Sequence, residues 1–262
     1  MYEFEFVTPK SLAEAVEALA EEDAQALGGG QTLIPTLKQR LAMPSRLVSL
    51  ARLDEIKGVR REGGQLCIGG GTTHAAVARE AAEAFPGLAA MAAHIGDPAV
   101  RNRGTIGGSL ANNDPSACYP AAALGTGATI VTDRREIAAD DYFQGMFTTA
   151  LEEGEIVTEL RFPIPQASNY QKFAQPASRF ALVGVFVARY PDGVRVAVTG
   201  ASEAGVFRWS EAEDKLGAEF SAGALEGLTL PGEGMISDLH GSGDYRAHLV
   251  CVMARRAVQA AG

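Results

Sequence analysis

The chain has 262 residues, of which 47% are hydrophobic and 21% charged, and it contains 30 glycines. This composition predicts a globular protein of one or two domains and excludes a disordered or collagen-like chain. Lysine and arginine number 23 against 32 aspartates and glutamates, which gives a formal net charge of −9. Because so acidic a chain lacks the basic surface that binds a phosphate backbone, nucleic acid and anionic membranes are unfavourable partners.

Cysteines and the N-terminal segment restrict the class of protein further. The three cysteines, Cys67, Cys118 and Cys251, lie far apart and form no C-x-x-C pair for zinc, an iron–sulfur cluster or a dithiol centre. The start, MYEFEFVTPK, has no basic flank followed by an apolar stretch, and no run approaches the roughly 18 apolar residues that cross a bilayer. We therefore expect a cytoplasmic protein with no metal site of its own and no membrane span.

In chain order, the first part predicts mixed helices and strands. Ser11 with Glu14 three residues later is a capping box and predicts the first helix, and a short apolar strand follows over 24–27. The run 28–35, GGGQTLIP, predicts a loop, because glycine permits left-handed backbone conformations. Further predicted elements are strands over 47–50 and 66–68 and a helix over 73–84 capped by Thr72 or Thr73.

The segment 101–115 is the longest polar and glycine-rich passage of the chain. A loop of more than about 12 residues inside a compact domain is usually functional or disordered, so we expect an ordered binding loop here. Pro163 and Pro165 end a predicted strand over 156–162 and indicate a domain boundary near residue 165.

The second part predicts an antiparallel sheet with helices. Apolar runs over 180–188 and 194–199 flank Pro191-Asp192-Gly193, which is typical of a hairpin turn. One helix is expected to be capped by Ser210 with Glu213, and another to run over 244–260. We expect this part to support the first or to contact a partner.

The sequence contains no self-sufficient catalytic motif. There is no HExxH, no G-x-S-x-G and no cluster of cysteine and histidine. The four histidines, His74, His94, His240 and His248, are scattered, and ordinary cap, surface or core roles are expected for them. We assign no catalytic residue.

The glycine segments match neither common nucleotide motif. Leu33 stands where the third glycine of a Rossmann fingerprint would be, and no G-x-x-x-x-G-K-[ST] occurs. Segments 28–35 and 104–115 nevertheless combine small residues with hydroxyls, and nests of backbone N–H groups bind anions without a lysine. We expect such nests to clamp a dinucleotide diphosphate, with Asp114 accepting a ribose or ribityl hydroxyl.

Close packing is the alternative interpretation of these glycines. For the two longer segments it is as well supported by the spacing as anion binding is. For Gly69, Gly70 and Gly71 it is the favoured interpretation, because that stretch is short and leads directly into a capped helix.

Three segments, in this order, resemble the FAD-binding medium subunits of molybdenum hydroxylases, the family of carbon monoxide dehydrogenase and xanthine dehydrogenase. They are GGGQTLIP at 28–35, DPAVRNRGTIGG at 97–108, and Asp114-Pro115. The resemblance extends over nearly the whole chain and implies an α+β fold. It implies a two-subdomain FAD-binding domain of the vanillyl-alcohol-oxidase (PCMH) type over 1–165, with subdomains of about 1–55 and 56–165. A small C-terminal α+β domain with an antiparallel sheet, the carbon monoxide dehydrogenase flavoprotein C-terminal domain, would occupy 166–262.

The resemblance also implies a set of FAD-binding residues. Relatives have aspartate where Cys118 stands, and a thiol is a weaker hydrogen-bond acceptor. Relatives often have a basic residue at the position of Ala174, a charge that Lys172 would supply here. Apolar Ile95 and Val157 would pack on adenine or flavin. The full set is Leu27, Gly28, Gly29, Gly30, Gln31, Thr32, Leu33, Ile34, Ile95, Thr105, Ile106, Gly107, Gly108, Ser109, Asp114, Cys118, Val157 and Lys172.

The function implied is that of an electron-transfer subunit with FAD as its cofactor. The molybdenum cofactor would lie on a large partner subunit and [2Fe–2S] clusters on a small one, in a dimer of heterotrimers that reduces an acceptor such as NAD or a quinone. Two alternatives remain open: a free-standing FAD-dependent oxidoreductase with its own substrate pocket, and a non-redox module whose glycine loops hold another nucleotide or shape a partner surface.

Overall fold

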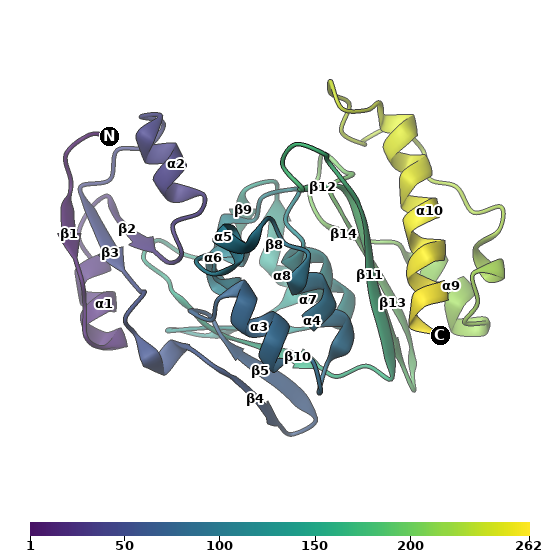
Figure 1. Ribbon diagram of the computed structural model, residues 1–262, viewed down its shortest axis with the longest axis horizontal. Helices are drawn as coiled ribbons and strands as arrows, with labels where there is room; N and C mark the ends of the chain where they lie inside the picture. The colour runs from purple at the N-terminus through teal and green to yellow at the C-terminus, as the bar shows by residue number, and fades with distance from the viewer.

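The N-terminal lobe is a small parallel sheet packed on a helix. The computed structural model describes residues 1–262, and in this lobe the strands lie in the order β1-β3-β2 (Figure 1). The Ser11 hydroxyl accepts a hydrogen bond from the Glu14 amide, which confirms the predicted helix start. The elements are β1 (Glu5–Val7), α1 (Leu12–Leu19), β2 (Ala24–Leu27), α2 (Leu33–Lys38) and β3 (Arg46–Ser49).

The glycine segment 28–35 is a loop only as far as Thr32, because α2 begins inside it. The Ile34 amide donates to the Gly30 carbonyl at 3.1 Å and so starts the first helical turn. Pro35 is the third residue of α2. Proline is tolerated there because N–H groups in the first turn of a helix have no intrahelical partner. The expectation of a loop through residue 35 was therefore wrong at its end.

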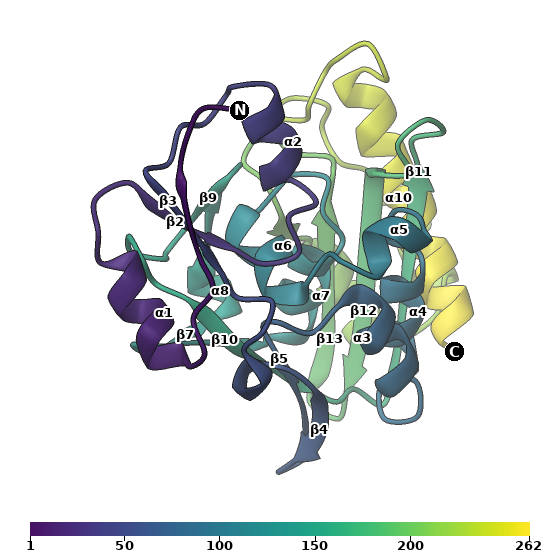
Figure 2. The ribbon, with the colours of Figure 1, turned by 60° about the vertical axis from the view of Figure 1, so that its left-hand side comes forward.

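The middle of the chain forms a five-stranded antiparallel sheet, β4-β5-β10-β6-β7, covered by helices on one face (Figure 2). β5 and β10 confirm the strands predicted at 66–68 and 156–162, and β3 confirms the one at 47–50. The strands are β4 (Val59–Glu62), β5 (Gln65–Gly69), β6 (Thr129–Thr132), β7 (Glu136–Ala138), β8 (Phe143–Gly145), β9 (Thr148–Thr149) and β10 (Val157–Pro163). The helices are the 3₁₀ helix η1 (Asp54–Ile56), α3 (His74–Glu80), α4 (Pro86–Ala93), α5 (Pro98–Arg101), α6 (Ile106–Asn112), α7 (Tyr119–Thr126) and α8 (Ala139–Tyr142).

The segment 101–115, expected to be one long loop, is largely helical. The Thr105 hydroxyl caps α6 by accepting from the Gly108 amide, and Asn113 ends that helix with a φ of 42°. Ile106 and Leu110 are fully buried and anchor it in the core. Ile106 and Leu110 are four residues apart, as on one face of a helix, but the glycines between them favoured a loop in the sequence analysis. Burial of this pair in the core stabilises α6 although glycine has a poor helix propensity.

The helix predicted over 73–84 is shorter in the structure. The Thr73 side chain caps α3 as expected, but α3 ends at Glu80, and Pro86 begins a second helix, α4. Ala81 and Phe85 are buried between the two, so the short break lets both helices pack on the same core.

The C-terminal sheet has the order β11-β12-β13-β14 and lies between two layers of helices (Figure 1). Phe186 and Ala188 of β12 face the core that includes α4 and α7, whereas Val185 and Val187 face the core that includes α10. A strand buried on both faces carries no apolar–polar alternation. The strands are β11 (Ala167–Ala174), β12 (Ala181–Tyr190), β13 (Gly193–Thr199) and β14 (Phe207–Arg208).

The hairpin predicted around Pro191-Asp192-Gly193 is confirmed, since Tyr190 pairs with Gly193 across the turn. β11, which the sequence did not predict, is the edge partner of β12.

The last elements are α9 (Ser210–Ala218), the 3₁₀ helix η2 (Gly223–Leu225) and α10 (Gly243–Ala261). Trp209, not Ser210, is the N-cap of α9, and Glu213 instead accepts from the Val196 amide and pairs with Arg208. The capping box expected there is therefore wrong, while the terminal helix is confirmed with Ser242 as its cap. None of the helices combines the length and apolar character that crossing a membrane requires.

Candidate functional site

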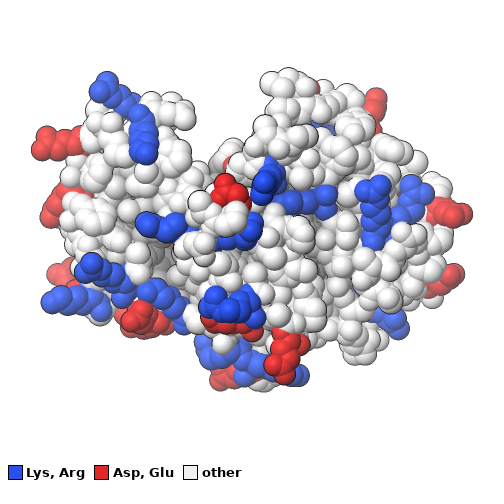
Figure 3. Space-filling model, viewed as in Figure 1, with Lys and Arg blue, Asp and Glu red and all other residues white.

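A cleft of about 1530 Å³ separates the N-terminal lobe from the rest of the molecule. Figure 3 shows it as a deep notch between two lobes. Small-molecule sites are usually about 300–1,000 Å³, so this cleft has room for an extended ligand of dinucleotide size. Its walls come from the loop between β2 and α2, the helices α3 and α6, and the connection between β11 and β12.

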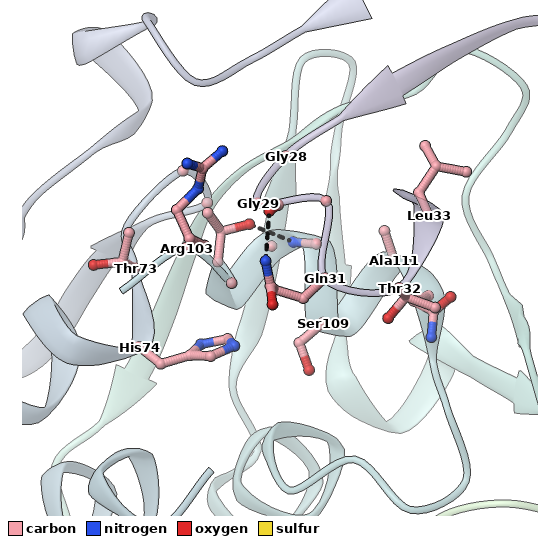
Figure 4. Close-up of a pocket in the computed structure, with 18 of the residues that line it drawn as sticks. Gly28, Gly29, Gln31, Thr32, Leu33, Thr73, His74, Arg103, Ser109 and Ala111 are labelled. Carbon is pink, nitrogen blue, oxygen red and sulfur yellow. Dashed lines mark hydrogen bonds between the residues drawn. The ribbon is translucent and has the colours of Figure 1, made fainter. Parts of the chain in front are cut away.

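The first wall presents backbone N–H groups that no other backbone group uses. No amide from Gly28 to Thr32 donates to a backbone carbonyl. The Gln31 side chain donates to the Gly29 carbonyl at 3.3 Å and folds the loop on itself (Figure 4). Gly30 has a φ of 70°, which disfavours any residue with a side chain. The loop therefore offers hydrogen-bond donors in the arrangement that suits an anion.

The same glycines also make a close packing contact. A Cβ on Gly29 would stand 2.0 Å from the carbonyl oxygen of Arg103, and one on Gly28 would stand 2.9 Å from the Thr105 hydroxyl. The two glycine segments thus lie directly against each other. Close packing and open amides, which were alternatives in the sequence, occur together here.

The second wall differs from the expected nest. The Ile106 amide donates to the Thr72 carbonyl at 3.0 Å and the Gly107 amide to the Gly70 carbonyl at 2.9 Å. The Gly108 amide donates to the Thr105 hydroxyl. The bonds to residues 70–72 occupy the amides of Ile106 and Gly107. At the cleft this segment therefore offers the first turn of α6 and the Ser109 side chain instead of a row of free amides.

Gly70 explains how these segments come together. A Cβ on Gly70 would stand 2.1 Å from the Val157 carbonyl, and one on Gly69 would stand 2.4 Å from that of Ile56. The packing role favoured for this stretch is confirmed. Gly70 and Gly71 also line the cleft, so this turn forms part of its floor.

Positive side chains outnumber negative ones around the cleft, although the chain as a whole is acidic. Figure 3 shows blue Lys and Arg side chains on both sides of the floor of the notch, with red acidic atoms between them. Of the lining acids, Glu155 is buried and pairs with Arg135 at 3.0 Å. The lining cations are Arg52, Lys57, Arg103, Lys172 and Arg179, and the lining acids are Glu80, Asp114 and Glu155. This local field favours an anionic ligand.

At the end of the cleft formed by β11, Lys172 lies beside Cys118. The Lys172 ammonium is 3.7 Å from the Cys118 sulfur and donates to the carbonyls of His94 at 2.7 Å and Arg179 at 2.9 Å. Asp114 accepts from the Ser116 amide at 2.8 Å, so its carboxylate is partly occupied within its own turn.

His74 lines the cleft, although the sequence predicted only an ordinary cap, surface or core role for it. It is the first residue of α3, its ring lies 5.3 Å from that of Tyr119, and its Nδ1 has no hydrogen-bond partner. Burial, with the nearby charge of Arg101, lowers the pKa of His74 to about 4. The ring is therefore neutral at physiological pH. The place of His74 at the cleft depends on a long-range backbone bridge between Thr73 and Thr105.

Most of the expected binding residues meet in this one cleft. Ile34 and Ile106 do not line it: Ile34 packs against Gly30, and Ile106 is fully buried in the core. The residues brought together are Leu27, Gly28, Gly29, Gly30, Gln31, Thr32, Leu33, Ile95, Thr105, Gly107, Gly108, Ser109, Asp114, Cys118, Val157 and Lys172.

Comparison with known proteins defines the class. Residues 2–165 match the family model described as the FAD binding domain in molybdopterin dehydrogenase. The carbon monoxide dehydrogenase medium chain of Afipia carboxidovorans is 35% identical, over 98% of this chain and 96% of that one. The nicotine 6-hydroxylase medium subunit of Paenarthrobacter nicotinovorans is also 35% identical, with the same coverage.

Solved structures agree with the sequence matches. A chain of quinoline 2-oxidoreductase from Pseudomonas putida 86 has a TM-score of 0.89 at 32% identity, covering 99% of this chain and 97% of that one. The fold and the cleft thus define an FAD-binding α+β protein. More particularly, the chain belongs to the FAD-binding medium subunits of the molybdenum hydroxylase family, and it is an oxidoreductase subunit.

Proposed function

We propose that this chain is the electron-transfer subunit of a molybdenum hydroxylase complex. When bound, FAD supplies the redox step, accepting electrons from a [2Fe–2S] cluster on a small partner and reducing an acceptor such as NAD or a quinone. The substrate is oxidised at the molybdenum cofactor of a large partner. Family membership and the names of the relatives, medium chains of dehydrogenases and hydroxylases, support this division of work.

The observation that carries the binding assignment is the row of free amides from Gly28 to Thr32, which lines a cleft with a cationic surround. A diphosphate carries two negative charges and needs several donors, and this loop supplies them with no lysine in contact. The adjoining hydroxyls of Thr105 and Ser109 extend the polar wall on the other side. The cleft volume of about 1530 Å³ also fits a dinucleotide.

At the opposite end the chain's own residues hold the flavin ring. There the Lys172 ammonium supplies a positive charge fixed by two carbonyls, while Ile95 and Val157 supply apolar surface for the adenine or the flavin. A cation at that position stabilises negative charge that develops on the ring. Asp114 retains acceptor capacity for a ribose or ribityl hydroxyl.

The proposed assembly places this chain between two partners in a dimer of heterotrimers. We propose the same division of the chain, an FAD-binding domain over 1–165 and a C-terminal domain over 166–262. The apolar residues that β12 shares between two cores make the junction between these domains a packed one.

The test uses the complex co-purified with its partners. We expect flavin and iron–sulfur absorption bands together, and melting of the chain at higher temperature as FAD is added, because tight binding stabilises the folded state by mass action. Complex stripped of FAD should still have its clusters reduced by dithionite but should reduce neither NAD nor a quinone. Restoring FAD should restore acceptor reduction.

Either of two results would contradict the proposed function and favour an alternative. Sustained turnover of a small-molecule donor by the isolated FAD-loaded chain would indicate a free-standing oxidoreductase. A chain that stays colourless with excess FAD, and whose melting temperature does not change, would indicate a non-redox module.

A further inference from the structure

Cys118 and Lys172 form a pair of nucleophiles that the proposed function does not require as a pair. The Cys118 sulfur and the Lys172 nitrogen are 3.7 Å apart, and both residues line the cleft. From this geometry we propose that peroxide converts the pair into a covalent and reducible S–O–N bridge. The site is one of oxidative modification, with hydrogen peroxide as the co-reactant.

The position of the lysine is fixed by its neighbours. Its ammonium donates to two backbone carbonyls, of His94 and Arg179, and its third contact is the sulfur. No carboxylate pairs with it, so no ion pair must break for the nitrogen to react. The amine is thereby held beside the one cysteine that lines the cleft.

The alternative fates of an oxidised Cys118 are restricted by the fold. All three cysteines are buried, but only Cys118 lines the cleft, whereas Cys67 lies in β5 and Cys251 in α10. A sulfenic acid commonly condenses with a neighbouring thiol. Here the neighbouring nucleophile is an amine. The Tyr170 hydroxyl also neighbours Cys118, but burial, together with that thiol, raises the pKa of Tyr170 well above its ordinary value, so it stays a phenol and is a poor nucleophile.

The chemistry balances with two equivalents of peroxide. In the first step the Cys118 thiol attacks one peroxide oxygen, the O–O bond breaks, and a sulfenic acid and one water form. In the second step the sulfenic acid, the neutral amine and a second peroxide give S–O–NH and two waters, with a new O–N bond and a second O–O bond broken. Including the proton released by the ammonium, the sum is RSH + R′NH₃⁺ + 2 H₂O₂ → RS–O–NH–R′ + 3 H₂O + H⁺.

The bridge would have two structural effects. It would tie Cys118, the residue that precedes α7, to β11, and so join the two proposed domains covalently. It would also replace the ammonium of Lys172 by an uncharged nitrogen and remove one positive charge from the cleft wall. Four thiol equivalents would reverse both effects, RS–O–NH–R′ + 4 R″SH → RSH + R′NH₂ + H₂O + 2 R″SSR″, with the S–O and O–N bonds broken and the oxygen leaving as water.

The test uses the full-length FAD-loaded protein exposed to hydrogen peroxide, with free thiols then alkylated and the protein digested without reductant. Mass spectrometry should find the Cys118 and Lys172 peptides joined, with the added mass of one oxygen and the loss of two hydrogens. Dithiothreitol should abolish the joined species. Cys118→Ser and Lys172→Arg should lack it, and Cys251→Ser should keep it.

Mass spectrometry of the unsubstituted protein decides the question, so the test remains valid even if a variant folds poorly. If Cys118 stays reduced, or becomes sulfenic or sulfinic acid while Lys172 remains free, the proposal is wrong. The bridge does not rest on the proposed function. FAD-free protein treated in the same way should form the joined peptides even if flavin binding were disproved.

Discussion

Gly29 lies so close to Arg103 that a Cβ on residue 29 would stand 2.0 Å from the Arg103 carbonyl oxygen. This contact joins the two glycine segments, and it places the free amides of the first segment at the cleft. The loop cannot accept even alanine at residue 29 without moving away from residues 103–104. Binding and packing therefore depend on the same glycine.

We expect Gly29→Ala to weaken FAD binding by about tenfold or more, about 1.4 kcal/mol, because the displaced loop no longer aims its amides at one point. The increase in melting temperature on adding FAD should shrink accordingly. Gly217→Ala is the control. A Cβ on Gly217 meets nothing within 4 Å, and in helix α9 it should stabilise the protein by about 0.5–1 kcal/mol. Equal FAD affinity in Gly29→Ala and the unsubstituted chain would contradict the assignment of the loop.

Local patterns predicted the first helix, the strands β3, β5 and β10, and the hairpin, because each depends on neighbouring residues. β11 was missed because its residues are half-buried along most of its length and show no alternation. The helix α6 was missed because three small residues follow Ile106, and burial, not propensity, stabilises it. Neither the partial burial of β11 nor the burial of α6 can be recognised from neighbouring residues alone.

The candidate site, too, was predicted only where it depends on neighbouring residues. The glycine segments were identified from the sequence together with the family resemblance, but the bonds from Ile106 and Gly107 to residues 70–72 reduce the second segment's free donors. His74 and Arg52 could not be placed at the cleft, because their positions depend on how distant segments pack.

Protonation of His74 should make stability depend on pH. Its pKa falls from 6.5 to about 4 on folding, so the unfolded chain binds the extra proton between these values. The free energy of unfolding should thus be constant above pH 6.5 and decrease as the pH falls towards 4, by roughly 2 kcal/mol between pH 7 and pH 5.

The variant His74→Gln should lose this component, measured by urea unfolding at the two pH values. His240→Gln, at an exposed position, should retain it. Persistence of the full decrease in His74→Gln would assign it to another group.

Glu155 titrates in a lower range and allows an independent test. Burial alone would raise its pKa, but hydrogen bonds from Arg135 and Thr132 hold it at about 2. Because this pKa is below the ordinary 4.5, the pair stabilises the fold above pH 4.5, and that stabilisation is lost as the pH falls towards 2. We expect Glu155→Gln to lower the free energy of unfolding at pH 7 by about 1–3 kcal/mol.

The matched control for Glu155 is Glu153→Gln, two residues away at an exposed position. It should change the free energy of unfolding by less than about 0.5 kcal/mol. Similar losses in both variants would show that the ion pair between buried Glu155 and exposed Arg135 contributes little.

Ser109 offers the most direct test of occupancy, because its side chain lies in the cleft between His74 and Thr32 (Figure 4). Ser109→Leu adds apolar volume where a ligand would lie, and α6 tolerates leucine. We therefore expect a folded protein whose FAD dissociation constant rises by about tenfold or more. Ser109→Ala removes only the hydroxyl and should raise that constant by about two- to fivefold, the loss of one hydrogen bond. Fluorescence titration of the FAD-free protein measures both. Unchanged affinity in Ser109→Leu would mean that the cofactor does not lie along α6.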